Sequence, residues 1–253
     1  MPAAILARLA LLEARRGGLP WLAGAALAAG FGLAAFLSQV ALTESLQLQA
    51  AILAAWLRAC AVFLVAAQVS SSVLREIQEK GLEMMLALPL SRSAQYLGRF
   101  LGYALCGVSI AALSGLALLP WAPPAAVALW SASLACEVAL VAAAALFFAM
   151  TLAQLVPAIA ATAGLYLLGR SISAIQAIAS GPGIDASLAS SIARLSVDAI
   201  ALILPPLEAT TRTEWLLYGA PAWPEAGAAI GALLVYTALL LAAGLFDFHR
   251  RGT

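Results

Sequence analysis

The sequence predicts an all-α membrane protein with six transmembrane helices, an N-terminal interfacial helix and both termini in the cytoplasm. The 253 residues are 64% hydrophobic and 10% charged, and the mean hydropathy is +1.01. Soluble domains are about half apolar and about a quarter charged, so a soluble fold could not cover this much apolar surface. The net charge of +1 provides no basic excess for nucleic acid, and we expect no such partner.

Six apolar segments are long enough to cross a bilayer, which takes about 20 helical residues. The chain is rich in Ala and Leu, both strong helix formers, and it lacks the alternating ten-residue strands of a membrane barrel. The first segment is about 23 residues long, too long for the apolar core of a signal peptide, and is interpreted as a retained span. A single transmembrane domain over 1–253 is therefore expected, with spans at 19–41, 51–72, 97–119, 126–150, 154–177 and 226–246.

Residues 1–18 have the pattern of a helix that lies in the membrane interface. Ile5, Leu9 and Leu12 fall on one side of such a helix, whereas Arg8 and Arg15 fall near the other.

The positions of Lys and Arg in the short loops predict the orientation. Basic residues precede the first span, surround the loop between the second and third spans, and follow the last span. These three groups lie on one face, which is therefore expected to be the cytoplasmic face of a bacterial inner membrane. They are Arg8, Arg15 and Arg16; Arg75, Lys80, Arg92 and Arg99; and Arg250 and Arg251.

The outer segment at 178–225 is expected to contain short helices on or partly in the outer leaflet. Gly181-Pro182-Gly183 breaks the preceding helix, and Pro205-Pro206 interrupts a second apolar stretch. A re-entrant hairpin formed by 186–204 is the alternative that the sequence leaves open.

The cytoplasmic loop at 74–92 reads LREIQEKGLEMMLALPLSR. Val73, Ile77 and Leu88 recur at helical spacing, with Met84 or Met85 between them and an interruption at Gly81. Pro89 ends this amphipathic helix. Such a helix, held by short links to two spans, is suited to receive a push from a cytoplasmic partner, although an ordinary solvated loop would have a similar composition.

This loop resembles the first cytoplasmic loop of the permease subunits of type-2 ATP-binding-cassette (ABC) transporters. That loop commonly contains Arg-Glu, Leu-Glu, a Leu-rich run, Pro and Ser-Arg. Lys80 and Gly81 depart from the pattern, which has Gly and then Thr or Ser there. The matching positions are Arg75-Glu76, Leu82-Glu83, 84–88, Pro89 and Ser91-Arg92.

The resemblance implies a permease of an exporter that is coupled to a separate ATPase. Two permeases, either two copies of this chain or this chain and a paralogue, would sit on two ATPase subunits, and the latter would bind ATP and Mg. No cofactor is expected in this chain. The loop residues expected to serve coupling to the ATPase are Arg75, Glu76, Glu79, Glu83, Pro89 and Arg92.

Catalytic motifs are absent from the sequence. Lys80 is the single lysine and follows Glu79, so the chain cannot supply a standard phosphate-binding loop. The single histidine, His249, lies beyond the last span, which argues against a metal centre or a Ser-His pair within the chain. We therefore expect a protein that is not itself an enzyme.

Three charged residues, Arg58, Glu137 and Arg170, fall inside predicted spans, where each needs a partner. At about 1.5 Å per residue, all three lie roughly 10 to 17 Å below the outer surface. We expect a cluster in which one carboxylate is shared between two guanidinium groups. It would act either as a structural clamp between three helices, as buried ion pairs more often do, or as a contact for an anionic substrate.

Two further functions fit the same layout. One is a permease for cofactor maturation, of the haem or copper-site type. The other is a membrane scaffold or sensor that is coupled to an ATPase without transport.

Overall fold

The computed structural model describes residues 2–40, 45–79, 91–179, 188–221 and 223–250. These residues are almost entirely helical and include no strand, which confirms the all-α prediction. The elements are α1 (Pro2–Arg16), α2 (Leu19–Val40), α3 (Ser45–Gln78), α5 (Arg92–Leu118), α6 (Pro124–Leu152), α7 (Leu155–Ala179), α8 (Leu188–Ile203), the 3₁₀ turn η1 (Leu207–Ala209), α9 (Glu214–Tyr218) and α10 (Trp223–Arg250).

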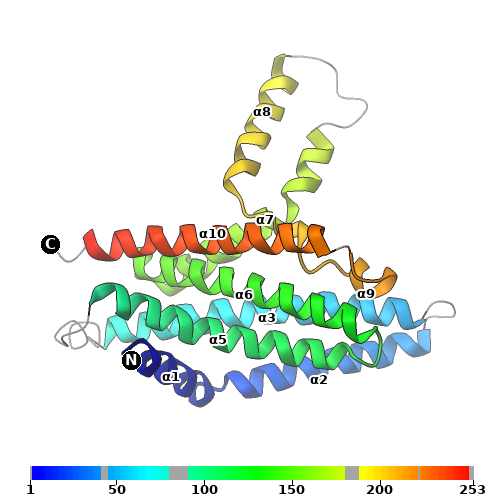
Figure 1. The fold of residues 1–253 in the computed structure, drawn as a ribbon, viewed down its shortest axis with the longest axis horizontal. Helices are drawn as coiled ribbons and strands as arrows, with labels where there is room; N and C mark the ends of the chain where they lie inside the picture. The colour runs from blue at the N-terminus through cyan, green and yellow to red at the C-terminus, as the bar shows by residue number, and fades with distance from the viewer. Residues whose placement is uncertain (1, 41–44, 80–90, 180–187, 222, 251–253) are drawn as a thin grey trace.

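Six of these helices, α2, α3, α5, α6, α7 and α10, are long and apolar enough to cross a membrane. They coincide with the six predicted spans. In Figure 1 they run along one common bundle axis, except for the last part of α7, which turns away from it, and the two termini lie at the same end of the bundle. The end of α3 and the beginning of α5 lie there too, whereas α9 lies at the opposite end. We call these the terminal end and the α9 end.

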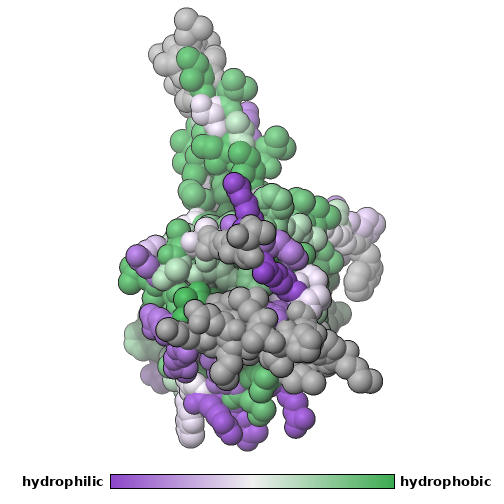
Figure 2. Space-filling view, turned by 90° about the vertical axis from the view of Figure 1, so that its left-hand side faces the viewer, coloured by the Kyte–Doolittle hydropathy of each residue, from purple (hydrophilic) through white to green (hydrophobic). Residues whose placement is uncertain are grey.

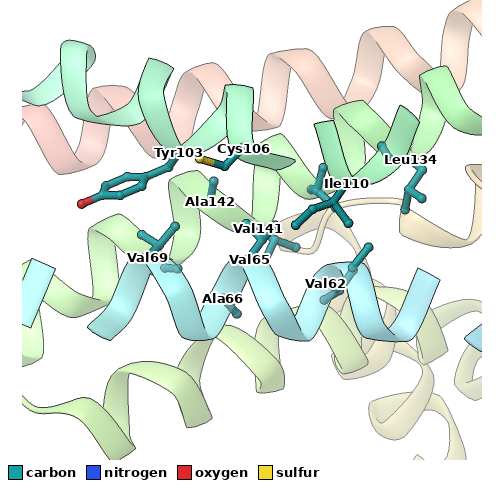
Figure 3. Packing of buried hydrophobic residues seen from close by; sticks show 14 of the residues in the cluster. Val62, Val65, Ala66, Val69, Tyr103, Cys106, Ile110, Leu134, Val141 and Ala142 are labelled. Atoms are coloured by element: carbon teal, nitrogen blue, oxygen red, sulfur yellow. The ribbon is translucent and has the colours of Figure 1, made fainter. Parts of the chain in front are cut away.

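Helix α6 forms the centre of the bundle and packs against α3, α5, α7 and α10. The core between α3, α5 and α6 consists mainly of small and branched side chains, shown in Figure 3. Gly107 of α5 permits close approach, because a Cβ there would lie 3.0 Å from Cγ2 of Val138. The residues labelled in this core are Val62, Val65, Ala66, Val69, Tyr103, Cys106, Ile110, Leu134, Val141 and Ala142.

The N-terminal helix α1 packs against α5 through an alanine face. Ala7, Ala10 and Ala14 are buried, and a Cβ at Gly102 of α5 would lie only 2.5 Å from the Cβ of Ala10. Leu9 remains exposed, so an apolar surface is still available to the predicted membrane interface. The alanine face therefore attaches α1 to the bundle.

Helix α3 extends further than the predicted span at 51–72. It continues to Gln78, so Arg75 and Glu76 lie on the spanning helix itself and not in a separate loop helix beginning at 74. The physical reason is that 45–80 contain neither Gly nor Pro, and Val73 is buried. The expectation for the remainder of the coupling loop, 80–90, lies outside the described residues.

The outer segment contains short helices, as predicted, since α8, η1 and α9 lie between α7 and α10. The last part of α7 and the whole of α8 form a helical hairpin that projects from the side of the bundle (Figure 1). The residues that enter the bundle follow α8, at 204–211, since Leu207, Thr210 and Thr211 are fully buried. Pro205-Pro206 explains the change of direction, because two prolines end α8 and begin an irregular segment.

Candidate functional site

Glu137 lies on α6 in the bundle core and is completely buried. The Tyr166 hydroxyl of α7 donates to its Oε1 at 2.7 Å, and the Thr211 hydroxyl donates to its Oε2. Arg170 forms an ion pair with the same Oε2, with its Nη1 at 3.9 Å. Both carboxylate oxygens are thus occupied by groups from α7 and from the outer segment.

Arg170 of α7 binds the irregular segment more closely than it binds Glu137. Its Nη1 donates to the carbonyl oxygens of Leu207 at 2.7 Å and Thr210 at 3.0 Å, and to Oγ1 of Thr211 at 3.1 Å. Its Nη2 donates to the Thr211 carbonyl at 3.5 Å. The guanidinium group therefore serves chiefly as a donor to backbone carbonyls.

Arg58 of α3 reaches the same segment from the other side. Its Nη1 donates to the Thr211 carbonyl at 3.0 Å, whereas the ion pair of Glu137 is with Arg170. Thr211 adopts a left-handed conformation with φ 46°, and its N–H donates to Oγ of Ser133 at 3.2 Å. The three predicted charges thus meet, but they meet around Thr211. The direct sharing of one carboxylate by both guanidinium groups is not what the structure shows.

This geometry supports the structural clamp. Irregular backbone at membrane depth is tolerated only where its polar groups find partners inside the protein. Residues 207–211 have three carbonyls that accept hydrogen bonds from Arg58 or Arg170. The buried carboxylate of Glu137 balances charge and fixes the Thr211 side chain. We call the group of Arg58, Glu137, Arg170 and Thr211 the clamp.

A polar hollow of about 290 Å³ opens beside the clamp toward the α9 end. Arg170, which is 21% exposed, contributes one wall. The remaining lining includes two carboxylates, Glu208 and Glu214, as well as Arg212 and Thr213. This mixed charge gives little support to the prediction of a contact dedicated to an anionic substrate.

At the terminal end, polar contacts connect α1, α3 and α5. Glu76 of α3 forms an ion pair with Arg99 of α5 at 2.8 Å, and Arg99 is only 4% exposed. The Ser72 hydroxyl donates to Glu13 of α1 at 2.7 Å and lies 2.9 Å from the Tyr103 hydroxyl of α5. Since the Ser72 proton is directed to Glu13, Tyr103 is the donor in the second contact. We call these five residues the terminal network.

The residues predicted to couple to an ATPase separate into three groups. Arg75 and Glu79 are exposed and lie one helical turn apart. Glu76 and Arg92 make contacts within the bundle, Glu76 with Arg99 and Arg92 with the His249 carbonyl at the end of α10. Glu83 and Pro89 lie outside the described residues. Figure 2 shows hydrophilic residues gathered over this end.

Thr211, Tyr166 and Ser133 are functional partners that sequence reasoning missed. A signal was present in Pro205-Pro206, because a helix break between apolar residues leaves carbonyls in need of donors. The arginines inside the spans could have supplied those donors. Within the described part of the chain, no group of three His, Cys, Asp or Glu residues is positioned to hold a metal ion.

Comparison with known proteins leaves the family open. No family model matches the chain, and no curated protein matches it.

Proposed function

We propose that this chain is the membrane-spanning permease subunit of an ATP-driven ABC exporter, in which a separate ATPase supplies the energy. Two permeases would assemble with two ATPase subunits, which bind ATP and Mg. Both termini would lie in the cytoplasm of a bacterial cell, and the membrane would be the inner membrane. The direction of transport rests on the resemblance of the 74–92 loop.

The observation that carries the proposal is the composition of the terminal end. Six membrane-length helices bring the end of α3, the beginning of α5 and both termini to one end of the bundle, where hydrophilic residues gather (Figures 1 and 2). Arg75 and Glu79 are exposed there, immediately before the loop that resembles a coupling helix. A cytoplasmic partner would thus meet charged side chains at the base of two spans.

The terminal network could transmit a displacement caused by such a partner to the helices of the bundle. Glu76 and Arg99 connect α3 to α5 across a largely buried ion pair, and Ser72 connects both helices to α1 through Glu13 and Tyr103. A displacement of the loop would therefore move three helices together. Packed helices respond to such a displacement as rigid bodies, which suits a switch between two states.

The clamp supports transport indirectly, by keeping the outer half of α3, α6 and α7 together with the irregular segment. Its groups bind one another and the backbone, so they are suited to hold the pathway's outer wall in place. We assign them no direct contact with substrate.

Affinity purification of the tagged chain in mild detergent, followed by mass spectrometry of co-purifying proteins, tests the proposal. A stoichiometric ABC ATPase is expected. Glu79→Ala should lower the recovered ATPase, whereas Glu214→Ala, an acidic change at the α9 end, should leave it unchanged. If no ATPase is recovered in any of several detergents, the proposal is wrong and a stand-alone scaffold or sensor becomes the better assignment.

A further inference from the structure

The described residues of the α7–α8 hairpin include several large apolar side chains that are exposed. Helix α8 packs against α7, and its outward residues include large apolar side chains such as Leu195 and Leu202, which are 73% and 87% exposed. Ile178 of α7 is 74% exposed. Figure 2 shows the hydrophobic surface continuing up the projection. We call residues 171–179 and 188–203 the arm.

The arm leaves the bundle after Gly169, before α7 has covered the full thickness of a membrane. Gly169 lies so close to the next segment that a Cβ would be 2.9 Å from the Pro205 carbonyl oxygen. Arg170 holds residues 207–211, which follow α8. The part of α7 inside the bundle, 155–169, is therefore about 22 Å long at the helical rise. A hydrocarbon core of about 30 Å is thicker than that, so the arm projects sideways at membrane depth.

Neither lipid nor water is a suitable covering for this arm. Leu195 and Leu202 would be poorly placed in water. Arg194 and Asp198 are also exposed on α8, and charged groups are costly in hydrocarbon. Each has a contact within the arm, from Arg194 Nε to the Ala179 carbonyl at 2.7 Å and from Gln176 to Asp198 at 2.9 Å. A guanidinium group and a carboxylate have further hydrogen-bonding capacity beyond one such contact.

The positions of these four α8 residues make one face that is complementary to itself. Arg194, Leu195, Asp198 and Leu202 follow helical spacing and fall on one side of α8, with Arg194 and Asp198 at the edge that contacts α7 and Leu195 and Leu202 further from it. Arg194 and Asp198 are four residues apart and carry opposite charges. In a two-fold pair of antiparallel helices, residue 194 of one copy therefore meets residue 198 of the other, and the reverse contact forms at the same time.

We propose that the arm is a docking surface for a second copy of this chain, with the Arg194–Leu195–Asp198–Leu202 faces of two α8 helices packed antiparallel. Two reciprocal Arg194–Asp198 ion pairs flank the leucines and remove the charges from lipid. The inference deepens the proposed function, because it names the surface at which two permease copies meet. It requires only the membrane placement of the bundle and is independent of ATPase binding.

Charge reversal in two differently tagged copies tests this arrangement. Arg194→Asp copies would place Asp opposite Asp, and Asp198→Arg copies would place Arg opposite Arg. Self-association is measured as the amount of one tagged copy that is recovered with the other from native membranes. Each variant should lower this amount by about tenfold or more. When an Arg194→Asp copy is expressed with an Asp198→Arg copy, both contacts become Asp–Arg again, and recovery should return to the wild-type level. Damage to folding cannot explain such a rescue, because each variant carries the same single change in both experiments.

Cysteine cross-linking supplies a second measurement. In a chain whose Cys60, Cys106 and Cys136 are replaced by alanine, Leu195→Cys should cross-link two copies, whereas Ile200→Cys, on the opposite side of α8, should not. The proposal is overturned if the single charge reversals still self-associate, if the mixed pair is not rescued, or if Ile200→Cys cross-links as well as Leu195→Cys. Recovery of the ATPase with those variants would show that the proposed function stands without this surface.

Discussion

Replacing Arg170 by methionine is the most direct perturbation of the clamp. The change removes the hydrogen bonds from Arg170 to the carbonyls of Leu207 and Thr210, although the Leu207 carbonyl keeps those from Thr210. It also leaves the fully buried Glu137 without its ion-pair partner. A hydrogen bond from a charged donor contributes about 1.5–3 kcal/mol. Breaking a buried ion pair on one side costs about 3–5 kcal/mol. Because these losses share one group they are not additive, and we expect Arg170→Met to lower the free energy of unfolding by about 3–5 kcal/mol.

Equilibrium unfolding in mixed micelles, followed by circular dichroism, measures that free energy. Arg212→Met is the matched control, since Arg212 is exposed and should change stability by less than about 1 kcal/mol. Glu137→Gln added to Arg170→Met removes the unpaired charge but does not restore the hydrogen bonds that Arg170 makes to the backbone carbonyls. The double variant should therefore lose less stability than the sum of the two single losses, with a coupling energy of about 1–3 kcal/mol.

Two results would contradict a stabilising role for the clamp. One is an Arg170→Met protein whose stability lies within about 1 kcal/mol of the wild type. The other is strict additivity of the Glu137→Gln and Arg170→Met losses, because independent effects would mean that the two side chains do not share an energetic unit.

Three further predictions concern the terminal end and use the same unfolding measurement. Gly102→Val should lower the free energy of unfolding by about 1–3 kcal/mol, because its Cβ would meet Ala10. Gly32→Val is the control and should cost little, since no atom lies within 4 Å of the added Cβ. Equal effects would contradict the close packing of α1. Glu76→Gln should cost about 1–3 kcal/mol, less than a fully buried pair because Glu76 is 24% exposed, and no loss would mean that the ion pair with Arg99 is not stabilising. Tyr103→Phe should cost about 1–2 kcal/mol, and a loss no greater than that of Tyr218→Phe at the surface would argue against the bond to Ser72.

The spans were predictable because length and hydropathy suffice to recognise them. Each of the six predicted segments coincides with a described helix. The bounds were less predictable at α3, since hydropathy falls after residue 72 while helix propensity continues to Gln78. Apolarity determines what enters a membrane, whereas Gly and Pro determine where a helix ends.

The meeting of the three intramembrane charges was predictable in depth but not in detail. Counting residues along the predicted spans placed Arg58, Glu137 and Arg170 at a similar depth below the outer surface. The sequence has no pattern that identifies Thr211 as their common partner, because it belongs to an irregular segment whose path depends on tertiary contacts. The direction of the arm was hidden for the same reason: periodicity identifies α8 as a helix but does not determine where it points.

The proposed function requires a partner ATPase that drives this chain through the residues between α3 and α5. The ATP hydrolysis rate of the purified complex tests this requirement, with the wild-type chain beside Glu79→Ala and Glu83→Ala and with Glu214→Ala as the control at the α9 end. We expect the two loop variants to lower ATP hydrolysis in the complex and the control to leave it unchanged. Equal rates in all four complexes, or the absence of any ATPase to assay, would contradict it.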